Sequence, residues 1–131
     1  MANQEIEIIL SRQWADNLSI PVFLVDTKGN LLFFNEPAEV ILGLRFEETG
    51  AMPVEEWSTI FKPQDINGKP LPMESLPLVK TLTNKIPEHG GFWIKSLEGK
   101  MFEIAVTSFP IIGRPDRFVG AMALFWKSAV L

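Results

Sequence analysis

The stretch that decides the fold is residues 101–126, MFEIAVTSFPIIGRPDRFVGAMALFW. Two runs rich in apolar residues flank the turn Gly113-Arg114-Pro115-Asp116, which predicts two antiparallel strands joined by a tight turn. Residues 118–126 are apolar at almost every position, whereas a strand with one solvated face alternates apolar and polar residues. We therefore expect this part of the sheet to be covered on both faces.

Three further strands are predicted before this pair. Residues 92–95 lead into the turn Leu97-Glu98-Gly99-Lys100, so the last three strands form a meander. Residues 20–25 and 31–34 are short apolar runs on either side of a polar turn containing Gly29, which predicts a hairpin near the start of the chain.

Helices are predicted between the two groups of strands. Asn35 suits an N-cap, Pro37 suits a first turn and Gly43 suits a helix end. A second helix is predicted over residues 75–86, stopped by Pro87. Residues 44–73 are predicted to be connecting structure, with one or two helical turns around residues 55–61.

A separate amphipathic helix is predicted over residues 3–17. Its apolar stripe consists of Ile6, Ile9, Leu10, Trp14 and Leu18. Ile8 interrupts the polar side, which suggests that the helix is covered on more than one side. The predicted class is α+β: a five-stranded antiparallel sheet with helices on one face, residues 18–131, preceded by a capping or dimerising helix, residues 1–17.

Composition excludes several classes of function. The net charge is −4 and no cluster of Lys and Arg is present, so we expect no nucleic acid and no membrane surface as partner. The chain has no cysteine, which excludes disulfides, thiolate catalysis and iron–sulfur clusters. The first residues lack the basic region of a signal peptide, and no apolar run reaches the roughly 20 residues of a membrane span, so we expect a cytoplasmic protein.

The order of these motifs resembles the PAS family over roughly residues 18–127. The residues that carry the resemblance are Pro21-Val-Phe-Leu-Val-Asp26, Gly29-Asn30, Asn35 with Gly43, residues 65–72 before Leu76-Pro77-Leu78, the Gly99 turn, Pro110, and Phe118-Val-Gly-Ala121. The resemblance implies a sensory or dimerising module of a bacterial signal-transduction protein, such as a two-component system. Its effector would be a kinase, a cyclase or a regulator, in cis or in trans.

The resemblance also indicates which chromophores to expect. Light-sensing members need a cysteine and hold the flavin with polar side chains on the last two strands, where the matching positions here are Ile104 and Met122. Haem-binding members place the proximal histidine on the long helix, whereas His89, the only histidine, follows Pro87 and is expected in a loop. We expect no metal, no haem through His89 and no photochemical flavin; a redox flavin held differently stays open.

No catalytic motif is present in the sequence. His89 has no accompanying Gly-x-Ser-x-Gly motif, no phosphate-binding glycine pattern occurs, and the pairs Glu47-Glu48 and Glu55-Glu56 are typical of solvated surface. We therefore expect a protein that is not an enzyme. The alternative is an α+β domain that binds a small apolar ligand, haem or flavin and has a redox or catalytic role.

The resemblance implies which side chains face the helices: Phe102, Ile104, Val106 and Ser108 on one strand, and Gly120, Met122 and Leu124 on the next. The candidate pocket residues are Trp57, Phe61, Leu78, Leu82, Trp93, Ile104, Val106, Ser108, Met122 and Leu124. These residues either fill one another as an ordinary core or enclose a small pocket for an apolar ligand, with Ser108 or Asn35 as polar anchor.

Alternation then assigns the opposite face of the sheet to Ala105, Thr107, Phe109, Val119, Ala121, Ala123 and Phe125. Such an apolar surface exceeds what a monomer usually exposes. The N-terminal helix covers it within one chain, or the helix and sheet together form a symmetric dimer. We predict a homodimer, with an interface made of Ile6, Ile9, Leu10, Trp14, Phe109, Ala121, Ala123 and Phe125.

Overall fold

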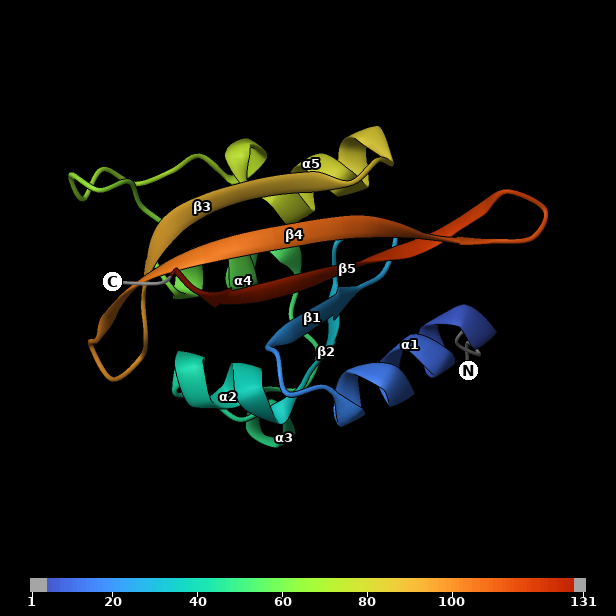
Figure 1. The fold of residues 1–131 in the computed structure, drawn as a ribbon, viewed down its shortest axis with the longest axis horizontal. Coiled ribbons are helices and arrows are strands. Elements are labelled where there is room, and N and C mark those ends of the chain that lie inside the picture. The colour runs from blue at the N-terminus through green and yellow to red at the C-terminus, as the bar shows by residue number, and fades with distance from the viewer. Residues whose placement is uncertain (1–4, 129–131) are drawn as a thin grey trace.

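The chain forms one five-stranded antiparallel sheet with the strand order β2-β1-β5-β4-β3 (Figure 1). The computed structural model describes residues 5–128. Residues 3 and 4 of the predicted first helix and residues 129–131 of the predicted sheet domain therefore lie outside the described residues. The strands are β1 Val22–Val25, β2 Leu31–Phe34, β3 Glu88–Lys95, β4 Met101–Gly113 and β5 Arg117–Lys127. The predicted sheet, its hairpin and its meander are confirmed.

The helices also follow the predicted order. They are α1 Ile6–Asn17, α2 Glu36–Leu42, α3 Phe46–Thr49, α4 Val54–Ile60, the 3-10 helix η1 Met73–Ser75, and α5 Pro77–Asn84. Helix α5 ends earlier than predicted, because Lys85 adopts a left-handed conformation before Pro87 is reached.

Asn35 connects three elements at the start of the domain. Its Oδ1 accepts hydrogen bonds from the backbone N–H groups of Ala38, as the predicted N-cap of α2, and of Val22 at the start of β1. Its Nδ2 donates to the carbonyl oxygens of Ala15 and Ile20, at 2.8 and 2.9 Å. Because every polar atom of this buried side chain is used in the fold, Asn35 is not the ligand anchor that the sequence suggested.

Different helices cover the two faces of the sheet. The inner face carries Phe23, Val106 and Phe125 and packs in one hydrophobic cluster with residues of α2, α4 and α5. The outer face carries Leu24 and Met122 and packs in a second cluster with α1, which contacts β1, β4 and β5 and lies beneath the β4–β5 hairpin in Figure 1. The two-sided cover predicted for β5 is thus present, although only part of the outer face lies under α1.

A β-bulge in β5 decides which side chains reach which face. Ile111 lies opposite Gly120, but the next residue, Ile112, lies opposite Phe118, so β5 contains one extra residue, Val119. A single extra residue reverses the facing of every side chain beyond it. Gly120 fits this crowded point because a Cβ there would collide with the carbonyl oxygen of Val25.

The bulge overturns the predicted facing of β5. Past it, Ser108 lies opposite Ala123 and Val106 lies opposite Phe125. Directly opposed residues of an antiparallel pair point to the same face, so Ala121, Ala123 and Phe125 point inward. Met122 and Leu124, predicted to face the helices, instead belong to the outer cluster.

His89 also differs from its prediction. It lies on strand β3 rather than in a loop, because β3 begins at Glu88 and runs through both glycines that follow the histidine. Its imidazole remains exposed, and its Nδ1 lies 3.0 Å from Thr107 Oγ1 on the neighbouring strand.

Candidate functional site

A cavity of about 70 Å3 lies between the inner face of the sheet and the segments around α4 and α5. Its lining is apolar except for one hydroxyl group, that of Ser58. The lining residues are Phe23, Leu42, Trp57, Ser58, Phe61, Pro63, Leu76, Pro77, Leu78, Phe92, Ile94, Ile104, Val106, Ala123 and Phe125.

Five of the ten predicted pocket residues line this cavity. The predicted residues that line it are Trp57, Phe61, Leu78, Ile104 and Val106. Leu82 packs against the same cluster without lining the cavity. Met122 and Leu124 lie on the outer face because of the bulge. Met122 therefore points away from the cavity and is not at the flavin-contacting position that the sequence comparison assigned to it.

The two other predicted pocket residues are used elsewhere. Trp93 lies opposite Glu103 in the β3–β4 pair, on the face opposite to Phe92 and Ile104. Ser108 is fully buried, but its Oγ lies 2.7 Å from Thr81 Oγ1, so it joins α5 to β4 and leaves no hydroxyl for a ligand.

Several residues that line the cavity were not predicted from the sequence. Ala123 and Phe125 were placed on the wrong face, and Phe23 was read only as part of a strand. Phe23 lies at the centre of the lining, with its ring centroid 5.3 Å from that of Phe125 and 6.1 Å from that of Trp57, both near edge-to-face. Trp57 is fixed in turn by its Nε1–H, which donates to the carbonyl oxygen of Gly29 at 2.7 Å.

Ser58 is a further cavity residue that was not predicted from the sequence, and its hydroxyl has no hydrogen-bond partner in the described chain. Its side chain is 4% exposed, and its Oγ is the one buried side-chain N or O atom without a partner among residues 5–128. A serine within a helix usually donates to the carbonyl one turn earlier, as Thr59 does to Glu55 at 2.8 Å. Ser58 is therefore the lining residue whose side-chain hydroxyl has no hydrogen-bond partner in the described chain.

A surface groove lies next to the cavity. Ser58 and Pro63 line both spaces, so the end of α4 forms a shared wall. The groove, about 310 Å3, is lined otherwise by Thr59, Lys62, Gln64, Gly68, Pro70 and Leu71. The groove therefore borders both Ser58 and the segment that follows α4.

The cavity does not fit haem or flavin. Its volume is well below the roughly 300–1,000 Å3 typical of sites for drug-sized ligands, and no histidine or charged side chain lines it. Within the described range, no three His, Asp or Glu side chains lie close enough to hold a metal ion.

Helix α1 presents a second candidate site, on the outer face. It docks on the sheet through Ile8 and Ala15, which are 3% and 0% exposed, and the Arg12 guanidinium lies 4.6 Å from the ring centroid of Phe33. The expected stripe of larger residues points the other way: Ile6 and Trp14 are 64% and 71% exposed. The helix therefore docks through its smaller apolar side and exposes its larger one.

The exposed residues of α1 lie on one side of the helix. At about 100° per residue, Ile6, Ile9, Leu10 and Trp14 fall within an arc of about 140°, opposite the direction of Ile8 and Ala15. We call these four residues the α1 stripe. Leu18, Ile20 and Trp126 are further exposed apolar residues beside the C-terminal end of this helix and strand β5.

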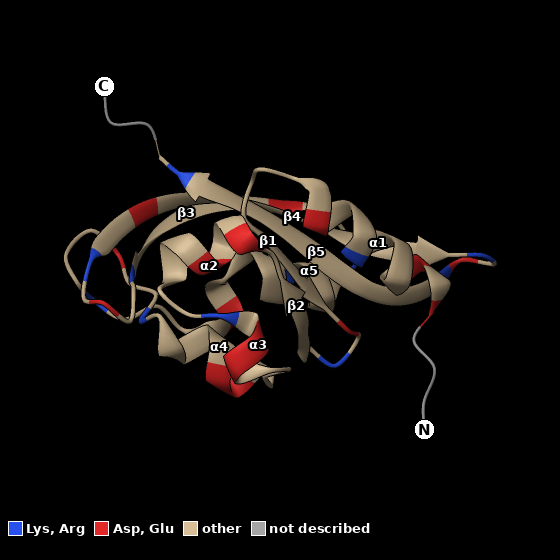
Figure 2. Cartoon of the chain, turned by 90° about the horizontal axis from the view of Figure 1, so that it is seen from below, with Lys and Arg blue, Asp and Glu red and all other residues tan. Residues whose placement is uncertain are grey.

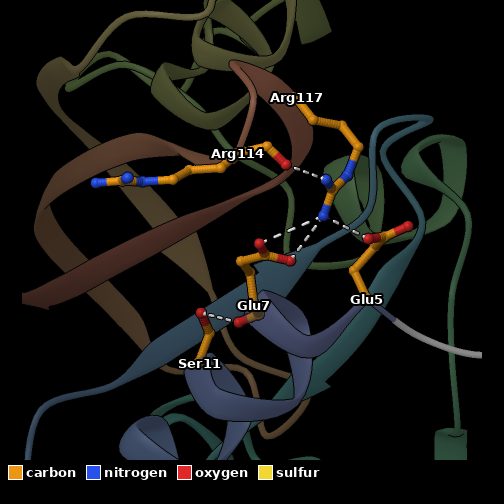
Figure 3. A network of polar contacts seen from close by, with 5 residues as sticks. All are labelled: Glu5, Glu7, Ser11, Arg114 and Arg117. Atoms are coloured by element: carbon orange, nitrogen blue, oxygen red, sulfur yellow. Dashed lines mark hydrogen bonds and ion pairs between the residues drawn. The ribbon is translucent and has the colours of Figure 1, made fainter.

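Polar contacts hold the first turn of α1 against the β4–β5 hairpin (Figure 3). Arg117 Nη2 lies 2.8 Å from Glu5 Oε2 and 3.1 Å from Glu7 Oε1, and Arg117 Nη1 donates to the carbonyl oxygen of Arg114. The first described residues are thereby joined to the start of β5, and α1 is positioned at both ends: by Arg117 near its start and by Asn35 near its last turn.

The predicted dimer interface needs correction on the sheet. Ala121, Ala123 and Phe125 are buried on the inner face and cannot touch a partner. Phe109 is half-buried in the outer cluster beside α1. The residues of the predicted interface that remain fully on the surface are those of the α1 stripe.

The acidic pairs lie apart from both sites. Glu47, Glu48, Glu55 and Glu56 are exposed, and Figure 2 shows acidic residues gathered on α3 and α4. No salt bridge joins these four to the cavity lining among the residues described, and they form solvated surface as expected. Across residues 5–128, no helix is long and apolar enough to cross a bilayer.

Comparisons with known proteins identify the fold. No known family profile and no curated protein matches the sequence. The structure matches a PAS domain from Colwellia psychrerythraea, with 17% identity, a TM-score of 0.64, and 92% of this chain and 97% of that chain covered.

Two further solved structures share the architecture. The PAS domain of BvgS from Bordetella pertussis has 12% identity and a TM-score of 0.70, over 96% of this chain and 89% of the other. The LOV domain of a blue-light activated histidine kinase from Erythrobacter litoralis has 12% identity and a TM-score of 0.67, over 87% and 100%. At such identities the likeness concerns the fold, and the fold predicted from the sequence motifs is confirmed.

Proposed function

We propose, from the premise that this chain has the PAS fold, that it is a sensory module that works as a homodimer in a bacterial signal-transduction protein. The observation that carries this proposal is the two-sided helix α1. Helix α1 uses Ile8 and Ala15 to dock within its own chain and leaves the larger α1 stripe exposed. A stripe of this size on a helix that is already docked is typical of a second interface.

A second copy of this chain is the partner that best suits the stripe. Ile6 and Trp14 lie four residues before and after Leu10, so these three positions are symmetric about Leu10, whereas the counterpart of Ile9 is Ser11. Two such helices packed antiparallel about a twofold axis at Leu10 would bring Ile6 of one chain against Trp14 of the other. A twofold dimer requires this self-complementarity of one patch.

The patch extends beyond α1 onto the sheet. Val22 lies opposite Leu124, and continuing this register by two residues brings Ile20 beside Trp126. Both residues are exposed by 40% or more, and both follow the outward-facing alternation of their strands. One helix of this length is short for a stable interface, and these residues supply additional apolar area.

The expected output is a change in a kinase, cyclase or regulator to which the module is joined or bound. One of the matched structures is described as a domain of a histidine kinase, which supports this kind of effector. In such an arrangement, a change at the inner cavity would reach the dimer through the sheet, because β1 and β5 carry cavity residues on one face and contact α1 on the other.

Light scattering after size-exclusion chromatography tests the dimer. The whole chain should elute at twice its own mass, and Trp14→Glu should elute as a monomer with unchanged circular dichroism. Thr59→Glu, an exposed helical substitution on the inner side, serves as control and should remain dimeric. A wild-type chain that stays monomeric at high concentration would exclude the proposal.

Binding of a small apolar molecule in the inner cavity is a second function that a specific observation supports. The lining is aromatic and aliphatic, with the single hydroxyl of Ser58 lacking a partner. A site that is mostly apolar and has few polar groups is the usual form of a small-molecule pocket.

A further inference from the structure

We infer that the inner cavity selects a small uncharged molecule, apolar over most of its surface, that carries one hydrogen-bonding group paired with Ser58 Oγ. This inference rests on the ligand-binding part of the proposed function and names its ligand class and its anchor. Three features of the site support it: an unpaired hydroxyl, the chemistry of the wall around it, and the groove beside it.

The unpaired hydroxyl is unfavourable for the fold alone. A buried polar group without a partner destabilises the folded state, whereas an alanine at the same position would have nothing to satisfy. The other buried hydroxyls nearby, Ser108 and Thr81, hydrogen-bond to each other at 2.7 Å. Ser58 is therefore the hydroxyl whose presence is best explained by a bound group.

The wall restricts the ligand to an uncharged molecule. No charged side chain lines the cavity, and an unpaired ion in such surroundings is strongly disfavoured. Ser58 also lies in α4, which ends at Ile60, so nearby backbone carbonyls present the negative end of the helix dipole. A carboxylate is disfavoured by both features, whereas an alcohol, ketone or ether is compatible with both.

The volume sets the size of the ligand. The cavity of about 70 Å3 is roughly half of the ~150 Å3 known to hold benzene in an engineered protein cavity. Scaled from the six non-hydrogen atoms of benzene, that ratio corresponds to about three non-hydrogen atoms inside the cavity itself. A molecule of four or five non-hydrogen atoms would extend past Ser58 and Pro63 toward the groove, because these two residues line both spaces.

Butan-1-ol and n-pentane are suitable probes because they have the same number of non-hydrogen atoms and differ in one hydroxyl. The experiment is a methyl-resolved NMR titration of the whole chain with each probe. In the wild type, both should shift the methyl signals of Ile104 and Val106, which line the cavity. Butyrate, the charged analogue, should bind at least about tenfold more weakly than butan-1-ol.

The decisive comparison uses Ser58→Ala. Its affinity for butan-1-ol should fall roughly three- to tenfold while its affinity for pentane stays constant, because one hydrogen bond is removed from one probe only. Ser108→Ala is the matched control: its hydroxyl is paired with Thr81 and lies outside the lining, so the ratio of the two affinities should not change.

Thermal unfolding without ligand gives an independent readout. Ser58→Ala should melt at the same temperature as the wild type or a few degrees higher, whereas Ser108→Ala should melt lower because Thr81 loses its partner. A lower melting temperature for Ser58→Ala would mean that its hydroxyl has a structural bond, and the inference would be wrong.

Other outcomes also overturn the inference. If neither alcohol nor alkane shifts the cavity methyls, the cavity binds no such ligand; if Ser58→Ala leaves the affinity ratio unchanged, Ser58 is no anchor. Equal binding of butyrate would contradict the uncharged class. None of these results affects the dimer, and a monomeric chain that still binds butan-1-ol would remove the dimer proposal and leave this one.

Discussion

The two faces of the sheet are covered by different kinds of side chain. On the inner face, large aromatic rings from β1, β5 and α4 meet around a cavity, with Phe23 in contact with Phe125 and Trp57. On the outer face, α1 approaches closely near its C-terminal end because the contact residue there is the small Ala15, which is fully buried. The inner face thus leaves space within the chain, and the outer face leaves apolar side chains outside it.

This difference separates the two proposed activities in space. In the proposed function, a molecule in the cavity would touch the inner side of β5, whereas a partner subunit would touch α1 on the outer side. Adjacent residues of one strand therefore belong to different sites. Substitutions of neighbouring residues should have separable effects on folding, ligand binding and assembly.

The largest effect is expected at neighbouring residues of β5. Phe125 is buried in the cavity wall, whereas Trp126 is 44% exposed on the outer side. Phe125→Ala should lower the free energy of unfolding by about 3–5 kcal/mol, because it removes a large buried side chain. Trp126→Ala should change it by less than about 1 kcal/mol. Urea unfolding measures both, and similar losses for the two would contradict the assigned facing.

Asn35 comes next, because it joins the outer helix to the core. Asn35→Ala removes the cap of α2, leaves the N–H of Val22 without its acceptor, and removes the amide donor that links the carbonyl oxygen of Ala15 to the core. We expect a loss of about 2–4 kcal/mol of stability. Hydrogen exchange should show faster exchange in α1 as well as α2; loss confined to α2 would mean that α1 is held independently.

The docked side of α1 should be sensitive to size. Ala15→Leu forces a larger side chain against the sheet and should cost about 1–3 kcal/mol in stability. Asp16→Leu, an exposed substitution on the same helix outside the α1 stripe, should leave stability within about 0.5 kcal/mol. Thermal unfolding of the two variants compares the sides, and a tolerated leucine at position 15 would show that α1 is not firmly docked.

The smallest effect is expected at Arg117. Its ion pairs with Glu5 and Glu7 are largely exposed, so Arg117→Ala should cost only about 0.2–1 kcal/mol, and less in high salt. Local exchange rates in the first turn of α1 should rise even where global stability hardly changes. Unchanged exchange there would mean that Ile8 alone positions the start of the helix.

The order of elements was predictable because each carries a local signal. Asn35 and Gly43 bound α2, and turns containing glycine separate the strands, as predicted. The facing of β5 was not predictable, because Phe118–Trp126 is apolar throughout and its pattern does not reveal a bulge. Only the pairing with β4 shows that Val119 is the extra residue, and every assignment beyond it followed from that single residue.

The candidate sites were predictable in part for the same reason. Cavity residues on β4 were assigned correctly because Phe102 to Ser108 alternate without interruption, whereas those on β5 were exchanged between the faces. The side of α1 that faces the sheet could not be predicted from the sequence either, because both sides of the helix are apolar. Which side docks depends on which one lets the helix approach the sheet closely. Ser58 has no sequence signal, since the partner that it lacks is visible only in three dimensions.

A single-cysteine cross-link tests the central claim most directly. The chain has no cysteine, so Leu10→Cys introduces one thiol at the predicted twofold axis, and Lys100→Cys introduces one in the β3–β4 turn. Under mild oxidation, Leu10→Cys should form a covalent dimer rapidly and nearly completely, and Lys100→Cys should not. If Leu10→Cys stays monomeric, or cross-links no faster than Lys100→Cys, the α1 stripe is not the interface between two copies of this chain.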